Sequence, residues 1–141
     1  MEYKNIVKGH FLSRPNRFIA KVEIGGREET VHVKNTGRCR ELLSPGAVVY
    51  VQDWGEAHPG RKTRYDLVTV EKGTLTINMD AQAPNRLFRE WAEAGHFVPG
   101  LTLLRPETTH GDSRFDFYWE AGQRRGFVEV KGVTLEEDGV A

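Results

Sequence analysis

The feature that most restricts the fold is a series of short strand patterns between residues 18 and 80. Apolar and polar residues alternate in five segments, which are 18–24, 28–35, 47–54, 64–71 and 74–79. The dipeptides Gly25-Gly26 and Lys72-Gly73 can form tight turns between neighbouring segments. A period of two residues is typical of β-strands that bury one face. We therefore predict that this region consists mainly of β-strands.

A single interruption separates the second strand pattern from the third. Residues 36–46 suit one helical turn that ends at Pro45-Gly46. Five short strands with one short helical piece predict a small closed barrel, and the OB-fold is the usual five-stranded version. A small barrel of another topology is the alternative.

The period of the apolar residues changes at Pro84. Between residues 83 and 95, Leu87, Trp91 and Ala94 recur about once per helical turn, and Gly95 follows as a C-terminal cap. Three further strand patterns come after this helix, at 100–106, 113–119 and 127–131. The chain is therefore expected to be mainly β and then α/β, with a barrel domain at 1–82 and an α-β-β-β domain at 83–141.

Two carboxylates stand in the last predicted hairpin, Asp116 in one strand and Glu129 in the other, with Lys131 two residues further on. If Glu120 pairs with Arg125 across the turn, Asp116 lies directly opposite Glu129. A shift by one residue would turn the apolar side chains to the wrong face, so the parity of this register is constrained.

Like charges that face each other destabilise a sheet by up to about 1 kcal/mol, so this pair needs a compensating cation. A Mg²⁺ or Mn²⁺ ion bound by Asp116 and Glu129 would neutralise both carboxylates, and Lys131 could then orient or polarise an attacking water. The alternative is an exposed face on which Asp116 pairs with Arg114 or Lys131, and Glu129 with Arg125.

A second group of candidate residues is cationic and lies near strand ends. Arginines and lysine next to the rings of Phe18 and Tyr65 are the mixture that binds single-stranded nucleic acids. These residues are Arg14, Arg17, Arg61, Lys62 and Arg64. Arg38 and Arg40 are candidate phosphate ligands, and the alternative is a structural turn in which Glu41 pairs with Arg38.

Composition excludes several classes of function. The 141 residues carry no formal net charge, 38% are hydrophobic, and no apolar run reaches the ~18–20 residues of a membrane helix. The first residues lack the apolar core of a secretory signal, so we expect a cytoplasmic protein without membrane contact. With one cysteine and five scattered histidines, neither disulfide nor zinc chemistry is expected.

Six segments occur together in a characteristic order: LSRPNRFIAKV, HVKNTGRCRELLSPG, RKTRYDLV, APNRLF, GDSRFDF and VEVKGVTL. In this order the chain resembles the sugar fermentation stimulation protein family, the SfsA-like proteins. The resemblance implies a DNA-binding regulator of sugar metabolism with an N-terminal OB-fold and a C-terminal domain similar to PD-(D/E)xK nucleases. It makes Asp116 the first motif carboxylate, and Glu129 and Lys131 the "ExK" pair.

Three functions stay open at this point. The first is DNA binding through residues such as Arg14, Arg17, Arg38, Arg40, Lys62 and Arg64, beside a nuclease-like metal site. The second is a Mg²⁺- or Mn²⁺-dependent DNA phosphodiesterase, and the third is an OB module for protein or sugar. A homo-oligomer is also left open. Because family members continue beyond Ala141 and the nuclease core needs a further helix and strand, we expect a partial second domain that is inactive alone.

Overall fold

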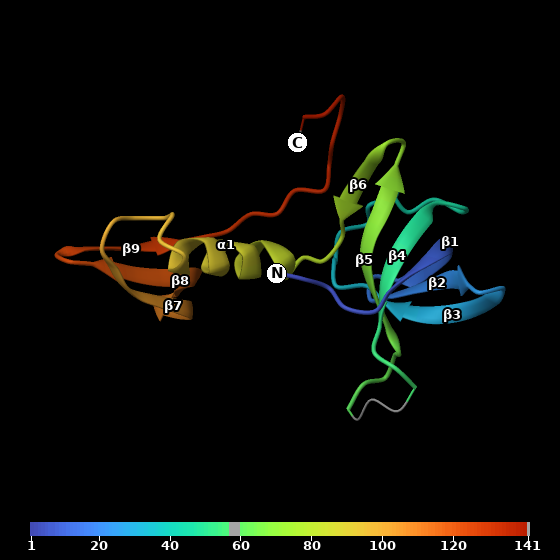
Figure 1. Cartoon of the computed structure of the whole chain (residues 1–141), viewed down its shortest axis with the longest axis horizontal. Coiled ribbons are helices and arrows are strands. Elements are labelled where there is room, and N and C mark those ends of the chain that lie inside the picture. Colours follow the sequence, from blue (N-terminus) through green and yellow to red (C-terminus); the bar gives the residue numbers. More distant parts are fainter. Residues whose placement is uncertain (57–59, 141) are drawn as a thin grey trace. The chain divides into compact units, whose positions relative to one another are not determined.

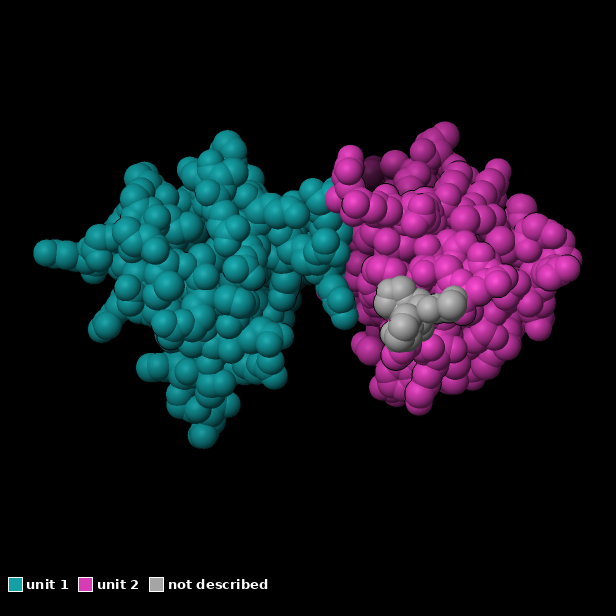
Figure 2. Space-filling model, turned by 60° about the horizontal axis from the view of Figure 1, so that its bottom comes forward, with its two compact units in different colours: residues 1, 82–132 teal, residues 2–81, 133–141 magenta. Residues whose placement is uncertain are grey.

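The structure is a computed structural model that describes residues 1–56 and 60–140. It divides into two compact units (Figure 2). The barrel unit contains residues 2–81 and the segment from 133 onward, and the sheet unit contains residue 1 and residues 82–132. None of the helices in the described part of the chain is long and apolar enough to cross a membrane.

Five strands close the barrel (Figure 1). They are β1 (Ile6–Asn16), β2 (Ile19–Ile24), β3 (Arg27–His32), β4 (Val48–Asp53) and β5 (Tyr65–Lys72). The neighbouring pairs β1–β2, β2–β3, β1–β4 and β4–β5 are antiparallel, and the parallel pair β3–β5 closes the ring through Val31 opposite Tyr65. The strand order β1-β2-β3-β5-β4 around the ring is that of an OB-type barrel, so the predicted fold is confirmed.

The identity of the five barrel strands corrects the sequence-based assignment. The pattern at 74–79 forms β6 (Leu75–Asn78), which pairs only with β5 and lies outside the ring, while β1 was not predicted. Register shifts within β1 and a glycine at position 9 interrupt its alternation. A Cβ atom at Gly9 would lie 2.6 Å from Val22 Cγ1, so the glycine is needed where β1 crosses β2.

The barrel core consists of side chains that point inward at every second position. Val22, Val31, Val49, Val51 and Leu67 are completely buried. Residues 36–46 contain the predicted single helical turn, in which the N–H groups of Leu42 and Leu43 both donate to the Cys39 carbonyl (3.0 and 2.8 Å), and a turn at Pro45-Gly46 follows it. The side chains of Leu42 and Leu43 join the core from this segment.

The sheet unit has the predicted order α-β-β-β. Its elements are α1 (Ala83–Glu93), β7 (Leu101–His110), β8 (Ser113–Ala121) and β9 (Arg124–Val128). The helix carries Pro84 in its first turn and ends in a Schellman motif, in which Gly95 has φ of +94° and His96 N–H donates to the Trp91 carbonyl. Both signals were read correctly from the sequence.

The three strands form an antiparallel sheet in the order β7-β8-β9, and α1 covers one of its faces. Phe88 of α1 packs against Phe117 of β8 (ring centroids 5.1 Å apart), and Phe97 packs edge-on against Trp119 (5.6 Å). Glu120 pairs with Arg125 as predicted, so Tyr118 and Phe127 share the opposite face. Similarity of this unit to PD-(D/E)xK nucleases stays a prediction.

Candidate nucleic-acid interface and carboxylate site

The barrel unit carries an arginine-rich pocket of about 350 Å³, which we call the arginine pocket. The end of β1, the turn after it and the segment that follows β3 form its walls. Its lining residues are Arg14, Asn16, Arg17, Thr36, Gly37, Arg38, Arg40 and Leu43. No acidic side chain is among these lining residues, so the pocket has a positive electrostatic potential.

Arg14 builds this pocket instead of offering free donors to it. Its guanidinium donates hydrogen bonds to four backbone carbonyl oxygens, those of Asn35 (2.6 Å), Gly37 (2.5 Å), Arg38 (2.8 Å) and Arg17 (2.7 Å). Burial lowers the pKa of the Arg14 guanidinium. Arg14 therefore ties the segment after β3 to the β1–β2 turn, a structural role that its sequence context did not reveal.

The other three arginines of the pocket are exposed and available. Arg17, Arg38 and Arg40 form no ion pair with any residue that the structure describes, so the predicted alternative pair between Arg38 and Glu41 is absent from this part of the chain. The ring of Phe18, which is 53% exposed, follows Arg17 directly. Guanidinium groups next to an exposed ring suit a phosphate and a neighbouring base.

The cations after β4 differ in their availability. Arg64 holds the Asp53 carboxylate with two hydrogen bonds (2.7 and 2.9 Å) and also contacts Glu56 (3.2 Å). These bonds lower the pKa of Asp53 and raise the pKa of Arg64. Lys62 is exposed and forms no ion pair within the described residues. Of the two predicted DNA ligands here, Lys62 is free and Arg64 is bound by acids.

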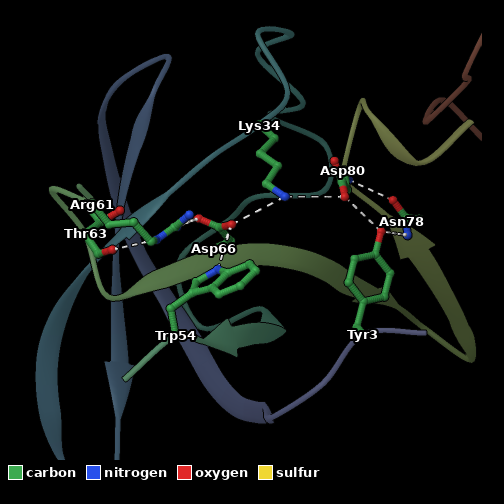
Figure 3. A network of polar contacts seen from close by, with 8 residues as sticks. All are labelled: Tyr3, Lys34, Trp54, Arg61, Thr63, Asp66, Asn78 and Asp80. Atoms are coloured by element: carbon green, nitrogen blue, oxygen red, sulfur yellow. Dashed lines mark hydrogen bonds and ion pairs between the residues drawn. The ribbon is translucent and has the colours of Figure 1, made fainter. Parts of the chain in front are cut away.

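A buried polar network stabilises the same end of the barrel and was missed by sequence analysis (Figure 3). Asp66 is only 1% exposed and accepts hydrogen bonds from Trp54 (3.0 Å) and Arg61. The Lys34 ammonium lies 3.4 Å from Asp66 and 3.7 Å from Asp80, which is 2% exposed. Buried carboxylates need such partners, because an unpaired charge in the interior is costly.

The network also fixes the chain on both sides of these acids. Tyr3 donates to the Asp80 carboxylate (2.9 Å), and the Asp80 N–H donates to the Asn78 side chain (2.8 Å). The Arg61 guanidinium stacks over the Trp54 ring at 4.8 Å. A signal was present in the sequence, because Asp66 stands between Tyr65 and Leu67 in a run of buried residues, but Lys34 and Asp80 are distant from it in the chain.

The carboxylate site lies in the sheet unit, at the end of β9. The register Phe117–Val128 is the last pair of the β8–β9 ladder, so Glu129 follows directly after it. Asp116 accepts hydrogen bonds from the Asn85 side chain of α1 (3.1 Å) and from the backbone N–H of Val130 (2.7 Å). Asp116 is therefore held between the helix and the segment that leaves β9.

Lys131 forms an ion pair with Glu129 in this site. The hydrogen bond to Glu129, and to a lesser extent the charge of Asp116, raises the pKa of Lys131. A Cβ atom at Gly132 would lie 2.8 Å from Pro84 Cγ, so the glycine lets the chain pass close to the first turn of α1. The structure thus brings Asp116, Glu129 and Lys131 together, while their proposed chemistry stays a prediction.

The donor set of this site fits a hard divalent cation only in part. Asp116 and Glu129 supply carboxylate oxygens, and each oxygen of Asp116 accepts one hydrogen bond and keeps a second lone pair. Within residues 1–56 and 60–140, no group of three or more His, Cys, Asp or Glu side chains is arranged to hold a metal ion. Waters or a substrate phosphate would have to complete the coordination.

The fold and the two sites define a class of protein with an OB-type barrel, a cationic pocket and a small α/β unit. Two family models match the chain, the SfsA N-terminal OB domain at residues 12–79 and the sugar fermentation stimulation protein RE domain at 82–141. The chain therefore belongs to the sugar fermentation stimulation protein family, as its sequence segments predicted.

Individual relatives agree with this assignment. A sugar fermentation stimulation protein homolog of Desulfitobacterium hafniense is 64% identical over 100% of this chain, which spans 60% of that relative. A homolog of Ruminiclostridium cellulolyticum is 56% identical, and the chain spans 62% of its length. A solved structure of Pyrococcus furiosus SfsA in complex with Ca²⁺ matches 97% of this chain and 58% of its own, with a TM-score of 0.84 and 32% identity.

Proposed function

We propose that this chain binds DNA through the arginine pocket of its OB-type barrel, as part of a regulator of sugar metabolism. The observation that carries the proposal is the group of three exposed guanidinium groups, Arg17, Arg38 and Arg40, with no acidic partner in the described chain. A surface that kept these cations only for solubility would not need Arg14 to hold four carbonyls in place beneath them.

The energetics of such binding are electrostatic. Each arginine that neutralises a phosphate releases condensed counterions, so affinity falls as the salt concentration rises. Phosphate contacts fix the position of the strand and carry no direct sequence information. The family name of the relatives supports the regulatory role.

A salt titration tests this proposal. Binding of a fluorescent oligodeoxynucleotide is measured by anisotropy at several salt concentrations for the wild type and for the variant Arg17→Gln/Arg38→Gln. We expect the log–log slope to become shallower by about 0.7 to 0.9 for each phosphate contact removed. Lys62→Gln tests the neighbouring cation in the same way.

The matched control is Arg27→Gln, which removes a charge from the exposed start of β3, away from the residues that line the pocket. This control should lower affinity only slightly. The proposal is wrong if the double variant and the control have the same slope, or if the wild type binds no DNA.

A second candidate function is metal-dependent hydrolysis of a DNA phosphodiester at the carboxylate site. It is supported by the placement of Asp116 next to the Glu129–Lys131 pair, and by the related Pyrococcus furiosus structure that is described with Ca²⁺. Asp116 and Glu129 would hold Mg²⁺ or Mn²⁺, which polarises a phosphate oxygen and activates a water when bound. The Lys131 ammonium would stabilise negative charge on the phosphate.

Substitution of Asp116 by asparagine tests this second function. We expect Asp116→Asn to abolish Mn²⁺ binding in calorimetry and any Mg²⁺-dependent DNA cleavage, while DNA binding by the barrel persists. Asp112→Asn, in the exposed turn before β8, is the control. Unchanged Mn²⁺ binding by Asp116→Asn would show that this carboxylate holds no metal.

A further inference from the structure

The sheet unit presents a group of aromatic rings on the face opposite α1. Tyr118 of β8 and Phe127 of β9 are direct cross-strand partners, with ring centroids 5.4 Å apart. Phe127 also stacks on Phe115 (4.6 Å, interplanar angle 25°) and contacts His110 (5.1 Å). We call these four residues the ring platform.

A cavity of about 450 Å³ lies against this platform. It is lined by His110, Tyr118, Arg125, Gly126 and Phe127. The Phe127 side chain at its wall is still 37% exposed, although it contacts three other rings. A large ring that packs on one side and remains open on the other can accept a further planar group.

Two arginines flank the platform on neighbouring strands. Arg105 of β7 pairs with Tyr118 in the ladder, and Arg125 stands two residues before Phe127, so both share the face of these rings. Neither arginine forms an ion pair with another described residue. Glu120, the acidic residue that pairs with Arg125 in the β8–β9 ladder, accepts a hydrogen bond from the Tyr118 hydroxyl (2.6 Å).

We propose that the ring platform stacks an unpaired base of a single-stranded nucleic acid, with Arg105 and Arg125 contacting the flanking phosphates. This inference rests on the proposed nucleic-acid binding and adds the type of strand. Bases inside a duplex are stacked on one another, so only a single strand can offer a free base face to protein rings. An apolar protein partner would bury the rings but would leave Arg105 without a counter-charge.

The platform and the carboxylate site are close in sequence but differ in the side of the sheet that they use. Asp116 precedes Tyr118 by two residues, and Glu129 follows Phe127 by two residues, a separation of about 7 Å along each strand. The Asp116 carboxylate accepts a hydrogen bond from Asn85 of α1, so it lies on the helix side of the sheet, whereas the rings lie on the opposite face. The proposal therefore concerns base stacking on the ring platform and not the carboxylate site.

The test uses a short single-stranded oligodeoxythymidylate with one 2-aminopurine, whose fluorescence decreases when the base is stacked. We expect quenching with the wild-type 141-residue chain, and affinity about tenfold lower for an oligonucleotide whose bases are replaced by abasic sites. Phe127→Leu and Tyr118→Leu, which remove a ring but keep an apolar side chain, should abolish the quenching and weaken binding to a similar degree.

Two controls separate stacking from loss of structure. Tyr118→Phe keeps the ring and removes only the hydroxyl, so it should retain the quenching. Far-UV circular dichroism and thermal unfolding of Phe127→Leu show whether the sheet unit is folded, and Arg105→Gln on the exposed part of β7 tests the same surface without a change in the rings. Arg105→Gln should lower the affinity for a single strand and leave duplex binding unchanged.

The outcomes distinguish this inference from the proposed function. If the chain binds single strands and Arg17→Gln/Arg38→Gln weakens that binding, but 2-aminopurine is quenched equally by Phe127→Leu, the ring platform binds no base. If no nucleic acid binds at all, both the proposed function and the inference fail. If sedimentation shows a dimer that Phe127→Leu dissociates, the platform is a protein contact and the inference is also wrong.

Discussion

The barrel unit and the sheet unit bury their apolar surface in different ways. In the barrel unit, closure through the β3–β5 pair leaves no edge among the five ring strands, and completely buried valines fill the interior. In the sheet unit, one helix covers one face of an open sheet with two edge strands, and Leu87 and Trp91 of α1 remain about half exposed.

This difference determines where each unit can carry functional groups. The closed barrel buries its apolar side chains inside, and the free arginines of the arginine pocket lie on turns, where Arg14 holds the backbone carbonyls in place. The open sheet leaves one face accessible, and there the aromatic rings lie on the strands themselves.

The largest effect is expected from Asp66→Ala, and this variant tests whether the two units are stable independently. Asp66→Ala removes the buried acceptor of Arg61 and of the Trp54 N–H and leaves Lys34 with Asp80 alone, so we expect the barrel to lose about 3–5 kcal/mol of unfolding free energy. Residue-resolved amide hydrogen exchange is the measurement. Exposed Glu28→Ala should change the free energy by less than about 0.5 kcal/mol.

Amide hydrogen exchange in β7–β9 of the Asp66→Ala variant shows whether the two units unfold independently. If the units are independent, the Asp66→Ala variant exchanges faster in β1–β5 only. An equal loss of protection in the sheet unit would show that both units unfold together.

A smaller effect is expected inside the sheet unit. Phe88→Ala removes the ring that joins α1 to Phe117 and Phe97, and should cost about 2–3 kcal/mol, below the range for a completely buried phenylalanine. Its neighbour Leu87 is 51% exposed, so Leu87→Ala should cost less than about 0.5 kcal/mol. Urea denaturation followed by far-UV circular dichroism measures both, and equal costs would disprove the packing of Phe88 against Phe117 and Phe97.

Lowering the pH should destabilise the barrel unit progressively. The bonds from Arg64 hold the pKa of Asp53 below its ordinary value, and the Gly139 N–H together with Lys72 lowers the pKa of Glu136. A pKa that is lower in the folded state stabilises the fold above the ordinary carboxyl pKa of about 4, and this contribution is lost as the pH falls through the folded value.

Thermal unfolding between neutral and acidic pH measures this dependence. Asp53→Asn should be less stable than the wild type near neutral pH and should lose less stability on acidification. A variant with the wild-type pH dependence would show that the Asp53–Arg64 pair does not contribute.

The smallest effect concerns the exposed ion pair Arg89–Glu93 on α1 (2.9 Å). Because both side chains are half exposed and four residues apart on one helix, Glu93→Gln should cost no more than about 0.5 kcal/mol. The same denaturation experiment at low and high salt checks it. A larger, salt-independent cost would mean that α1 depends on this pair more than on Phe88.

Much of the sheet unit could be predicted because its signals are local. Pro84 and Gly95 mark the ends of the helix, and the turn between β8 and β9 sets the register that places Tyr118 opposite Phe127. The candidate carboxylates, Asp116 and Glu129, follow from the same register. Their actual partners, Asn85 and Lys131, required the path of the chain after β9.

In the barrel unit, the sequence by itself determined that short strands would form a small closed barrel, because alternation and turn residues act over a few positions. Only the tertiary structure decided that β1 belongs to the ring and that β6 does not. It also decided the role of charged residues that look alike in the sequence. Arg14 is bound by carbonyls and Arg64 by Asp53, while Arg17 stays free, because these partners become neighbours only when distant segments fold together.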